Sequence, residues 1–312
     1  MLVIVAPGQG AQTPGFLNPW LELDGAADRL KAWSDVAGLD LVRYGTEGSE
    51  EEIKDTAVAQ PLLVAAGLLT ATELFGAPTG GPFAAVAGHS VGEITAAALA
   101  GVLSVEEALV FVRERSLAMA EAATVTATGM TALLGGDPEV VAAKLAEHGL
   151  TAANNNGGGQ LVAAGTLDQL AALKADPPAG ARVIPLKVAG AFHTEHMAPG
   201  VERLAKLAPT LTVHDPKVGY LSNKDGEVVQ SGTEVLDRLV SQVSNPVRWD
   251  LCMETLQQLG ATAVIELSPA GTLTNLVKRN VKGVATLALK TPADLDKARA
   301  LIEEHGGQEQ DA

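Results

Sequence analysis

Short, continuous apolar runs bounded by glycine or proline recur along the chain. The first is Leu2–Ala6, which ends at a Pro-Gly pair, and the second is Phe83–Ala87, which ends at a glycine. Runs of this length without polar alternation are typical of strands buried on both faces of a parallel sheet. The α/β pattern of apolar runs recurs at 218–223 and 263–269. The pattern therefore predicts an α/β fold built on a parallel sheet.

Helical segments separate these runs. The segment Ala57–Pro61 is predicted to open a long apolar helix that runs to about Leu74, with Pro61 in the first turn, where its missing N–H costs nothing. Gln60, just before that turn, is expected to be a solvated or capping amide more than a pocket residue. The Ser-Val-Glu-Glu sequence at 104–107 forms a capping box and predicts a second helix to about Ala122.

Arg115 falls on the apolar stripe of this second helix. Ala108, Val112 and Met119 share that stripe, whereas the two residues before Arg115 turn aside. A buried guanidinium requires an anionic partner, because burying it alone is costly. Two interpretations stay open: an ion pair with a core carboxylate, or a planar fork that binds a substrate carboxylate.

The pattern of apolar and polar residues changes near residue 126. Strands are predicted at 130–134, 150–153, 160–164 and 182–188, and helices at 138–148 and 168–174. This β-α-β-β-α-β order is the ferredoxin-like pattern and predicts a small subdomain inserted in a larger one. The Asn154–Gly159 segment is expected to be a hairpin turn more than a site, because Asn and Gly tolerate positive φ.

Composition narrows the classes of function. The 312 residues, 47% of them hydrophobic, suffice for one large or two unequal domains. A net charge of −15 argues against a general nucleic-acid or anionic-membrane surface, so an anionic partner must meet a local basic patch. Lys278, Arg279 and Lys282 form such a spot, although complementing a helix C-terminus also explains their charge.

The remaining composition signals concern compartment. A single cysteine, Cys252, excludes an internal disulfide and a cysteine metal cluster, and fits a reducing cytosol. The N-terminal apolar run is interpreted as a buried strand and not as a signal peptide. No apolar segment is expected to be long enough to span a membrane without interruption. The polar end of the chain from Glu303 is expected to fray.

The segment Gly88–Glu93, Gly-His-Ser-Val-Gly-Glu, lies between a predicted strand and a small-residue helix. In a strand-turn-helix context, Gly-x-Ser-x-Gly places the serine, here Ser90, in a strained elbow. The amide of Val91 would then point to where an oxyanion forms. An ordinary glycine turn remains the alternative, so partners elsewhere must decide.

Two such partners are candidates. The Gly8–Gln12 loop follows the first strand and is neither a P-loop nor a dinucleotide fingerprint, so an oxyanion loop and a plain turn are equally supported. His193 and His196 could bind a metal from one helix face, but no third ligand is evident and no metal is expected. His193, in a loop after the serine, is a better candidate general base, although a histidine alone is more often simply packed.

Together these motifs resemble the malonyl-CoA:acyl carrier protein transacylase family and the related acyltransferase domains of polyketide synthases, over essentially the whole chain. The matching segments are Pro-Gly-Gln-Gly-Ala-Gln at 7–12, Gln60-Pro61, residues 88–93, Arg115, Asn154, Asn156, Gln160, Phe192-His193 and Asn245-Pro246-Val247.

The resemblance implies a role for each matched residue. Ser90 would be the acyl-accepting nucleophile and His193 its base, without a carboxylate third member. The amides of Gln9 and Val91 would form the oxyanion hole, and Arg115 would bind the malonyl carboxylate. The main-chain carbonyl that orients the histidine maps to Arg248, where the family often has Gln.

Further positions are expected to bind substrate: Gln9, Gln60, Met119, Asn154, Asn156 and Phe192. The Phe192-His193 pair and Val91 resemble malonyl-selective relatives and not methylmalonyl-selective ones. The expected enzyme is a malonyl-CoA:acyl carrier protein S-malonyltransferase of fatty acid or polyketide biosynthesis, or both. It is expected to be a cytoplasmic monomer without metal or cofactor, docking its carrier protein at Lys278, Arg279 and Lys282.

The expected fold is an α/β-hydrolase-like large domain, residues 1–125 and 193–312, with a ferredoxin-like subdomain at 126–192 and the active site between them. Two rival functions remain. A serine esterase or thioesterase would need a triad acid between Ser90 and His193 and no carboxylate-binding arginine. A non-catalytic module that binds carrier proteins would leave the serine and histidine chemically silent.

Overall fold

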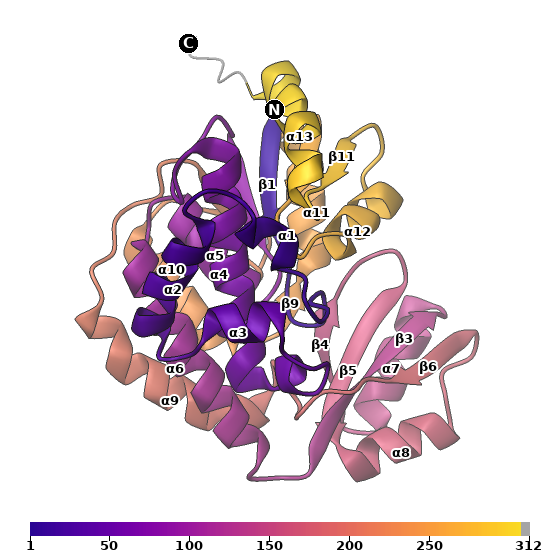
Figure 1. The fold of residues 1–312 in the computed structure, drawn as a ribbon. Helices are drawn as coiled ribbons and strands as arrows, with labels where there is room; N and C mark the ends of the chain where they lie inside the picture. The colour runs from indigo at the N-terminus through magenta and orange to yellow at the C-terminus, as the bar shows by residue number, and fades with distance from the viewer. Residues whose placement is uncertain (307–312) are drawn as a thin grey trace.

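The computed structural model describes residues 1–306 as two mixed sheets with helices packed around them (Figure 1). The larger sheet has the strand order β11-β10-β1-β2-β7-β8. Its strands are β1 (Leu2–Ala6), β2 (Ala85–Gly88), β7 (Gly219–Leu221), β8 (Val228–Val229), β10 (Ala263–Glu266) and β11 (Ala285–Ala288). All neighbours pair in parallel except β7 with β8 at one edge.

Strand β1 lies inside this sheet and contributes to two cores. Leu2 and Ile4 pack in one apolar cluster, and Val3 and Val5 pack in another on the opposite face. The prediction of a strand buried on both faces is therefore confirmed, because side chains alternate across a strand.

Helices cover both faces. Those of the N-terminal part are α1 (Asn18–Leu21), α2 (Ala26–Ala37), α3 (Leu41–Thr46), α4 (Thr56–Phe75), α5 (Gly92–Leu99) and α6 (Val105–Ala123). Those of the C-terminal part are α9 (Ala198–Leu207), α10 (Gly232–Gln242), α11 (Trp249–Gln258), α12 (Thr272–Asn280) and α13 (Leu295–His305). Single 3₁₀ turns lie at Glu52–Lys54, Glu195–Met197, Ala208–Thr210 and Pro292–Asp294. The predicted capping box at Ser104 and Glu107 starts α6 and is confirmed.

The smaller sheet has the order β6-β3-β5-β4-β9. Its strands are β3 (Thr128–Gly135), β4 (Thr151–Asn155), β5 (Gln160–Thr166), β6 (Ala181–Pro185) and β9 (Val247–Arg248). Helices α7 (Pro138–Glu147) and α8 (Leu167–Ala175) supply Val141, Leu145 and Leu173 to an apolar cluster with this sheet. The predicted β-α-β-β-α-β order of elements and the hairpin between β4 and β5 are confirmed.

Strand β9 was not expected. It lies far along the chain from the other four strands, yet it pairs in parallel with β4 and joins the smaller sheet to the rest of the molecule. Figure 1 shows this sheet projecting from one end of the larger body.

The prediction that Pro61 lies in the first turn of α4 is wrong. The helix begins at Thr56 behind the capping side chain of Asp55, so Pro61 lies inside it. The proline cannot donate to the carbonyl of Ala57, one turn back. Arg113 donates to that oxygen instead, from NH1 at 3.0 Å. A long-range partner therefore makes the internal proline tolerable.

Two further expectations need correction. Contrary to expectation, helix α4 is long and apolar enough to cross a membrane, judged by its length and composition alone. However, 89% of its apolar stretch is buried inside the protein. It is the central core helix. Helix α13 continues to His305, so the chain does not fray at Glu303; residues 307–312 of the expected frayed end lie outside the described residues.

Candidate active site

Ser90 lies at a sharp turn between β2 and α5. Its φ is 54°, and within residues 1–306 the one other non-glycine residue with positive φ is His193, at 62°. A Cβ added at Gly88 would lie 2.0 Å from the backbone carbon of Gly92, and one at Gly92 would lie 2.2 Å from the carbonyl oxygen of Ala6. Both glycines are thus required by the close approach of strand and helix, as the elbow prediction demands.

The two strained residues are hydrogen-bonded to each other. Ser90 Oγ is 2.8 Å from His193 Nε2, and His193 Nδ1 is 2.9 Å from the main-chain oxygen of Gln242. Because a carbonyl only accepts, Nδ1 carries the proton and Nε2 presents its lone pair to the serine. Burial and the nearby Arg115 charge lower the pKa of His193 to about 3. The imidazole is therefore neutral and able to accept a proton.

The expectation that the Arg248 carbonyl orients the histidine is wrong. The acceptor for Nδ1 is Gln242, in the last turn of α10. Arg248 instead lies in β9, where its amide donates to Asn223 at 2.8 Å and its guanidinium forms two hydrogen bonds with Asp250. Pairing with β4 holds this segment in the smaller sheet, which removes it from the histidine.

Arg115 is 1% exposed and hydrogen-bonds to neutral groups. NH1 donates to Gln60 Oε1, and NH2 donates to Gln242 Oε1 at 2.7 Å and to Ser90 Oγ at 3.3 Å. Burial lowers its pKa to about 10, a shift that the negative charge of Glu93 opposes. Among residues 1–306 no carboxylate oxygen lies within 4.0 Å of its nitrogens, so an internal ion pair does not account for this arginine.

Gln60 lines the pocket and is 1% exposed. The expectation of a solvated amide is therefore wrong. The early start of α4 turns this side chain inward, where it orients Arg115 and also donates from Nε2 to Met119 Sδ at 3.4 Å.

A polar network behind the serine was missed by sequence reasoning. Asn223 Oδ1 accepts from the Ser90 amide at 2.8 Å, and its Nδ2 donates to the Gly88 oxygen at 2.7 Å. Gln242 Nε2 donates to the Ser90 oxygen at 3.0 Å and to Glu93. Glu93 stands in the serine motif, but nothing local marked the other two residues, which are 133 and 152 positions from Ser90.

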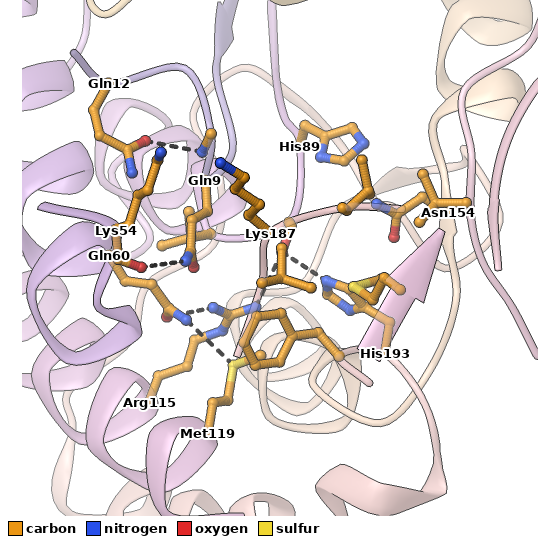
Figure 2. A pocket seen from close by; sticks show the side chains of 18 residues that line it. Gln9, Gln12, Lys54, Gln60, His89, Arg115, Met119, Asn154, Lys187 and His193 are labelled. Carbon is orange, nitrogen blue, oxygen red and sulfur yellow. Dashed lines mark hydrogen bonds between the residues drawn. The ribbon is translucent and has the colours of Figure 1, made fainter. Parts of the chain in front are cut away.

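The cavity at Ser90 has a volume of about 160 Å³. Of the expected site residues it is lined by Gln9, Gln60, Ser90, Val91, Arg115, Met119, Asn154, Phe192 and His193. Figure 2 shows Arg115 between Gln60 and His193, with Gln9 and Lys187 above Arg115 in this view. The lining residues that were not expected are Gly10, Gln12, Lys54, His89, Met130, Val162, Leu186, Lys187 and Val188. Several come from the smaller sheet and its exit, which only the fold brings to the serine.

The backbone amides expected in the oxyanion hole border this cavity. Neither the Gln9 nor the Val91 amide has an acceptor within the described part of the chain. The Gln9 side chain points toward the start of α4, where its Nε2 lies 3.4 Å from the main-chain oxygen of Lys54 and 3.5 Å from Thr56 Oγ1. Two free amides beside a serine hydroxyl can stabilise a developing oxyanion.

Asn156 does not line the cavity. It is 6% exposed, and its Oδ1 is 2.9 Å from His89 Nε2. The His89 ring in turn lies 5.9 Å from that of Trp249. Asn156 thus supports the pocket wall through His89, because the β4–β5 turn carries it behind that ring, and its expected substrate contact stays a prediction. Asn154 does border the cavity, and its buried Oδ1 has no partner within residues 1–306.

The remaining expected residues lie apart from the cavity. Lys278, Arg279 and Lys282 are exposed at the end of α12, and Arg279 borders a shallow pocket with Gln160 and Lys290.

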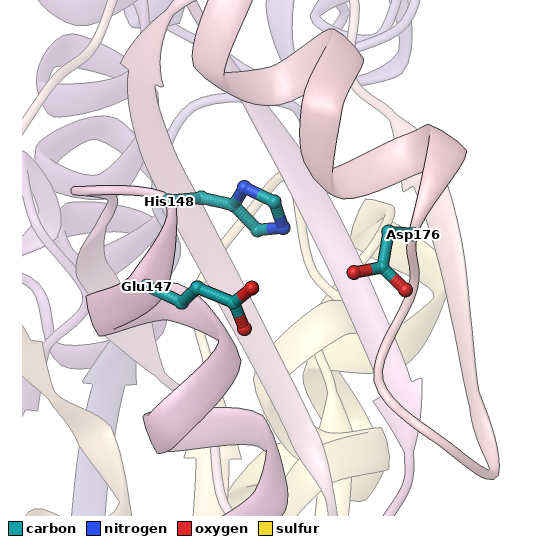
Figure 3. A group of neighbouring side chains, drawn as sticks. All are labelled: Glu147, His148 and Asp176. Atoms are coloured by element: carbon teal, nitrogen blue, oxygen red, sulfur yellow. The ribbon is translucent and has the colours of Figure 1, made fainter.

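One candidate metal cluster occurs among residues 1–306, and it involves neither His193 nor His196. It contains Glu147, His148 and Asp176 on the surface of the smaller sheet's helices (Figure 3). Lys144 Nζ lies 2.9 Å from Glu147 and 2.6 Å from Asp176, so an ammonium group already pairs with both carboxylates and offsets part of their charge.

Comparison with known proteins gives consistent matches. The model of the acyl transferase domain family matches residues 3–301. The malonyl CoA-acyl carrier protein transacylase of Mycobacterium bovis is 51% identical, over 95% of this chain and 99% of the relative, and that of Bacillus subtilis is 32% identical, over 97% and 98%. A crystal structure of MCAT from Mycobacterium tuberculosis is 50% identical, covers 95% of this chain and 98% of its own, and has a TM-score of 0.90. A type II polyketide acyl-carrier protein in complex with its malonyl-transacylase gives a match of 30% identity, over 95% and 98% of the chains, with a TM-score of 0.87.

Proposed function

The chain belongs to the acyl transferase domain family, and we propose that it moves a malonyl group from malonyl-CoA to the phosphopantetheine thiol of acyl carrier protein through a malonyl-serine. One observation carries the proposal. A buried arginine without a carboxylate partner in residues 1–306 lies 3.3 Å from a serine hydroxyl that is 2.8 Å from a neutral histidine. This arrangement supports the roles of Arg115 as the carboxylate-binding group and Ser90 as the acyl acceptor.

The first half reaction loads the serine. Malonyl-CoA enters with its free carboxylate on Arg115, and His193 Nε2 takes the proton of Ser90 Oγ as this oxygen attacks the thioester carbon. The amides of Gln9 and Val91 stabilise the oxyanion of the tetrahedral intermediate. The carbon–sulfur bond then breaks, and coenzyme A leaves with the proton from His193.

The second half reaction removes the malonyl group from Ser90. The thiol of the carrier protein gives its proton to His193 and attacks the malonyl-serine ester, and Ser90 recovers the proton as the serine–acyl bond breaks. The order of events is ping-pong, as expected of covalent catalysis. The function serves fatty acid or polyketide biosynthesis, or both, and a polyketide carrier protein is the partner in one of the structures matched above.

Two structural features support an enzyme that transfers the acyl group over one that hydrolyses it. The proton on His193 Nδ1 faces a main-chain oxygen, and no triad carboxylate contacts this ring within the described residues. Arg115 would fix the malonyl group where water is poorly placed to attack, because the ion pair fixes both ends of a short acyl chain.

The domain division belongs to the proposal. We assign residues 1–125 and 193–312 to an α/β-hydrolase-like large domain and 126–192 to a ferredoxin-like subdomain. The antiparallel order β6-β3-β5-β4, which is fourth, first, third and second of the insert's own strands, supports the second assignment. Strand β9 then adds a strand from the large domain to the subdomain's sheet.

Partners and location complete the proposal. The carrier protein, an acidic partner, docks on the exposed cations Lys278 and Arg279 in the last turn of α12 and Lys282 just after it. The enzyme acts as a cytoplasmic monomer, without metal or cofactor, and not on nucleic acid or membranes.

The test is intact mass after brief incubation with malonyl-CoA, acetyl-CoA or methylmalonyl-CoA. The proposal expects a malonyl adduct on the native chain, none on Ser90→Ala, and lost preference for malonyl on Arg115→Ala. No adduct on the native chain, or acetyl and malonyl adducts in equal amounts, would favour a hydrolase or an unselective acyltransferase.

A further inference from the structure

Glu93 is a buried carboxyl group that the mechanism above does not use. Its side chain is 1% exposed, and it accepts hydrogen bonds from the Asn223 amide, at 2.6 Å, and from Gln242 Nε2. Within residues 1–306 no cation lies in ion-pair distance of it. A second buried carboxyl group, Glu266, has a plain structural task, since it caps α12 by accepting from the amides of residues 271, 273 and 274. Glu93 requires a different account.

The two hydrogen bonds of Glu93 lead to the two sides of the site. Asn223 holds the nucleophile turn, through the Ser90 amide and the Gly88 oxygen. Gln242 holds the arginine, because its Oε1 accepts from Arg115 NH2 at 2.7 Å.

Glu93 and the main-chain oxygen of Ser90 together set the direction of the Gln242 carboxamide, because both accept from its Nε2. A carboxamide can turn over, exchanging its oxygen and its NH₂. An ionised carboxylate only accepts, so Gln242 must turn its NH₂ to Glu93 and its oxygen to Arg115. The guanidinium then has an acceptor on each terminal nitrogen, since Gln60 provides the other.

We propose that Glu93 is a positioning residue for malonyl selectivity: its carboxylate fixes the Gln242 amide, which in turn holds Arg115 in place for the malonyl carboxylate. The inference rests on the malonyl transfer proposed above and adds to it a residue that does not touch the acyl group.

A neutral amide at position 93 cannot satisfy both of its neighbours. Asn223 N–H and Gln242 NH₂ are both donors, so a glutamine there faces one of them with its own NH₂. The main-chain donor cannot turn, whereas the Gln242 side chain can. The NH₂ of Gln242 then keeps only the Ser90 oxygen as an acceptor. As the carboxamide moves to avoid the facing NH₂, its Oε1 no longer holds the guanidinium of Arg115 in place. The lost negative charge acts in the opposite direction, because it leaves Arg115 more attractive to a carboxylate.

The experiment compares initial rates of malonyl-enzyme and acetyl-enzyme formation by intact mass, for the native chain and Glu93→Gln. The proposal expects malonylation to fall about tenfold and acetylation to change less than about twofold, because only the malonyl group uses Arg115. Thr95→Val is the matched control: it removes another buried polar group from α5, one that packs against Gly67 of α4. It should leave the malonyl-to-acetyl ratio unchanged.

A second readout uses the native chain alone, so it does not depend on the variant folding. Burial raises the pKa of Glu93 to about 7. The groups that face it are Arg115 on α6, Tyr220 on β7 and Cys252 on α11; the pKa of Arg115 is about 10, and burial raises those of the other two. Glu93 is therefore the group in this cluster that titrates between pH 6 and 8.

Only the ionised carboxylate of Glu93 is purely an acceptor for Gln242, so the preference for malonyl should increase as the pH rises. The malonyl-to-acetyl ratio of the native chain should be high at pH 8 and fall several-fold by pH 6, while the ratio of Glu93→Gln stays low and flat. A ratio that is unchanged or raised in Glu93→Gln, or independent of pH in the native chain, overturns the proposal. Equal loss of both acylations overturns it too, since that indicates a disturbed serine turn. No malonyl adduct on the native chain overturns the transfer function itself.

Discussion

Two clusters of similar composition behave differently in this protein. The first, at the pocket, combines His193, Arg115 and Glu93, and the second, on the surface of the smaller sheet's helices, combines His148, Lys144 and two carboxylates. In the surface cluster the cation contacts both carboxylates directly, at 2.6 and 2.9 Å. In the pocket cluster the neutral amide of Gln242 separates the cation from the carboxylate.

The difference lies in what each cluster leaves available. The surface charges satisfy one another and are solvated, so their attraction is weak and screened by salt. The pocket charges are buried, and Arg115 keeps a guanidinium without an internal carboxylate partner in residues 1–306. A buried charge held only by neutral groups is costly unless a ligand completes it. Incomplete pairing, more than residue type, therefore marks the functional cluster.

The largest difference in transfer rate between pocket and surface variants is expected for changes to the nucleophile and its base. Ser90→Ala and His193→Ala should each lower transfer from malonyl-CoA to carrier protein by about 10⁴-fold or more, since both act on the same bond-forming step. Steady-state transfer assays measure this loss. His148→Ala, the matched change in the surface cluster, should retain native rates; a comparable loss there would contradict the distinction.

Arg115→Ala should have the next largest effect. Malonylation should fall about 10²- to 10³-fold, because a buried charge-assisted contact to the carboxylate is lost, and acetylation should fall far less. Its residual malonyl-enzyme should also hydrolyse faster than that of the native chain, since the acyl group is no longer fixed away from water. A pulse of malonyl-CoA followed by mass measurement over time gives this lifetime. An unchanged hydrolysis rate would remove Arg115 from the account of transfer over hydrolysis.

Charge reversal at and just after the end of α12 tests a third kind of cation, exposed and outside the pocket. Lys278→Glu, Arg279→Glu and Lys282→Glu together should raise KM for the carrier protein several-fold and leave KM for malonyl-CoA unchanged. The effect should shrink at high salt, as it does for any surface attraction. If both constants keep their native values, the docking surface lies elsewhere.

The pH dependence of acetylation should be small. Because burial and Arg115 lower the pKa of His193 to about 3, the base stays neutral between pH 5 and 8, and the acetylation rate should change less than about twofold there. The same shift affects stability: the unfolded chain binds a proton near pH 6.5 that the folded histidine refuses, so this residue's contribution to stability is lost as pH falls from about 6.5 toward 3. An acid limb near pH 6.5 in acetylation would contradict the neutral base.

The smallest effect belongs to the surface cluster. Hydrogen bonding to Lys144 lowers the pKa of Asp176, so this pair stabilises the fold above the usual aspartate pKa and loses its effect as the carboxyl is protonated in acid. Lys144→Met should shift the urea midpoint slightly at pH 7 and low salt, and hardly at all at high salt. Its transfer rate should equal the native one. A salt-independent loss of stability would indicate that this cluster is not the solvated pair described above.

Local sequence patterns predicted much of this site. The sharp turn at Ser90 could be predicted because Gly88 and Gly92 are required by close backbone approach. The importance of Arg115 could be predicted because it interrupts an apolar helical stripe. These are short-range steric and periodic constraints, which the chain carries in adjacent residues. The order of elements in the insert followed from the same kind of signal.

Other features had no local signal. Pro61 was placed in a first turn because nothing local shows that Arg113, on α6, donates to the Ala57 oxygen in place of the N–H that the proline lacks. The carbonyl that orients the histidine was assigned to Arg248, because motif spacing does not tell which backbone oxygen a loop brings to a ring.

The sequence by itself thus determined the strands, the strained serine and the type of each reacting group, since these depend on neighbours along the chain. Only the tertiary structure decided that Asn223, Gln242 and Glu93 form one network behind the serine, and that β9 crosses to the smaller sheet. The physical reason is that hydrogen bonds between distant segments depend on how helices and sheets pack. The residues that take part look, in the sequence, like any other buried or capping polar side chain.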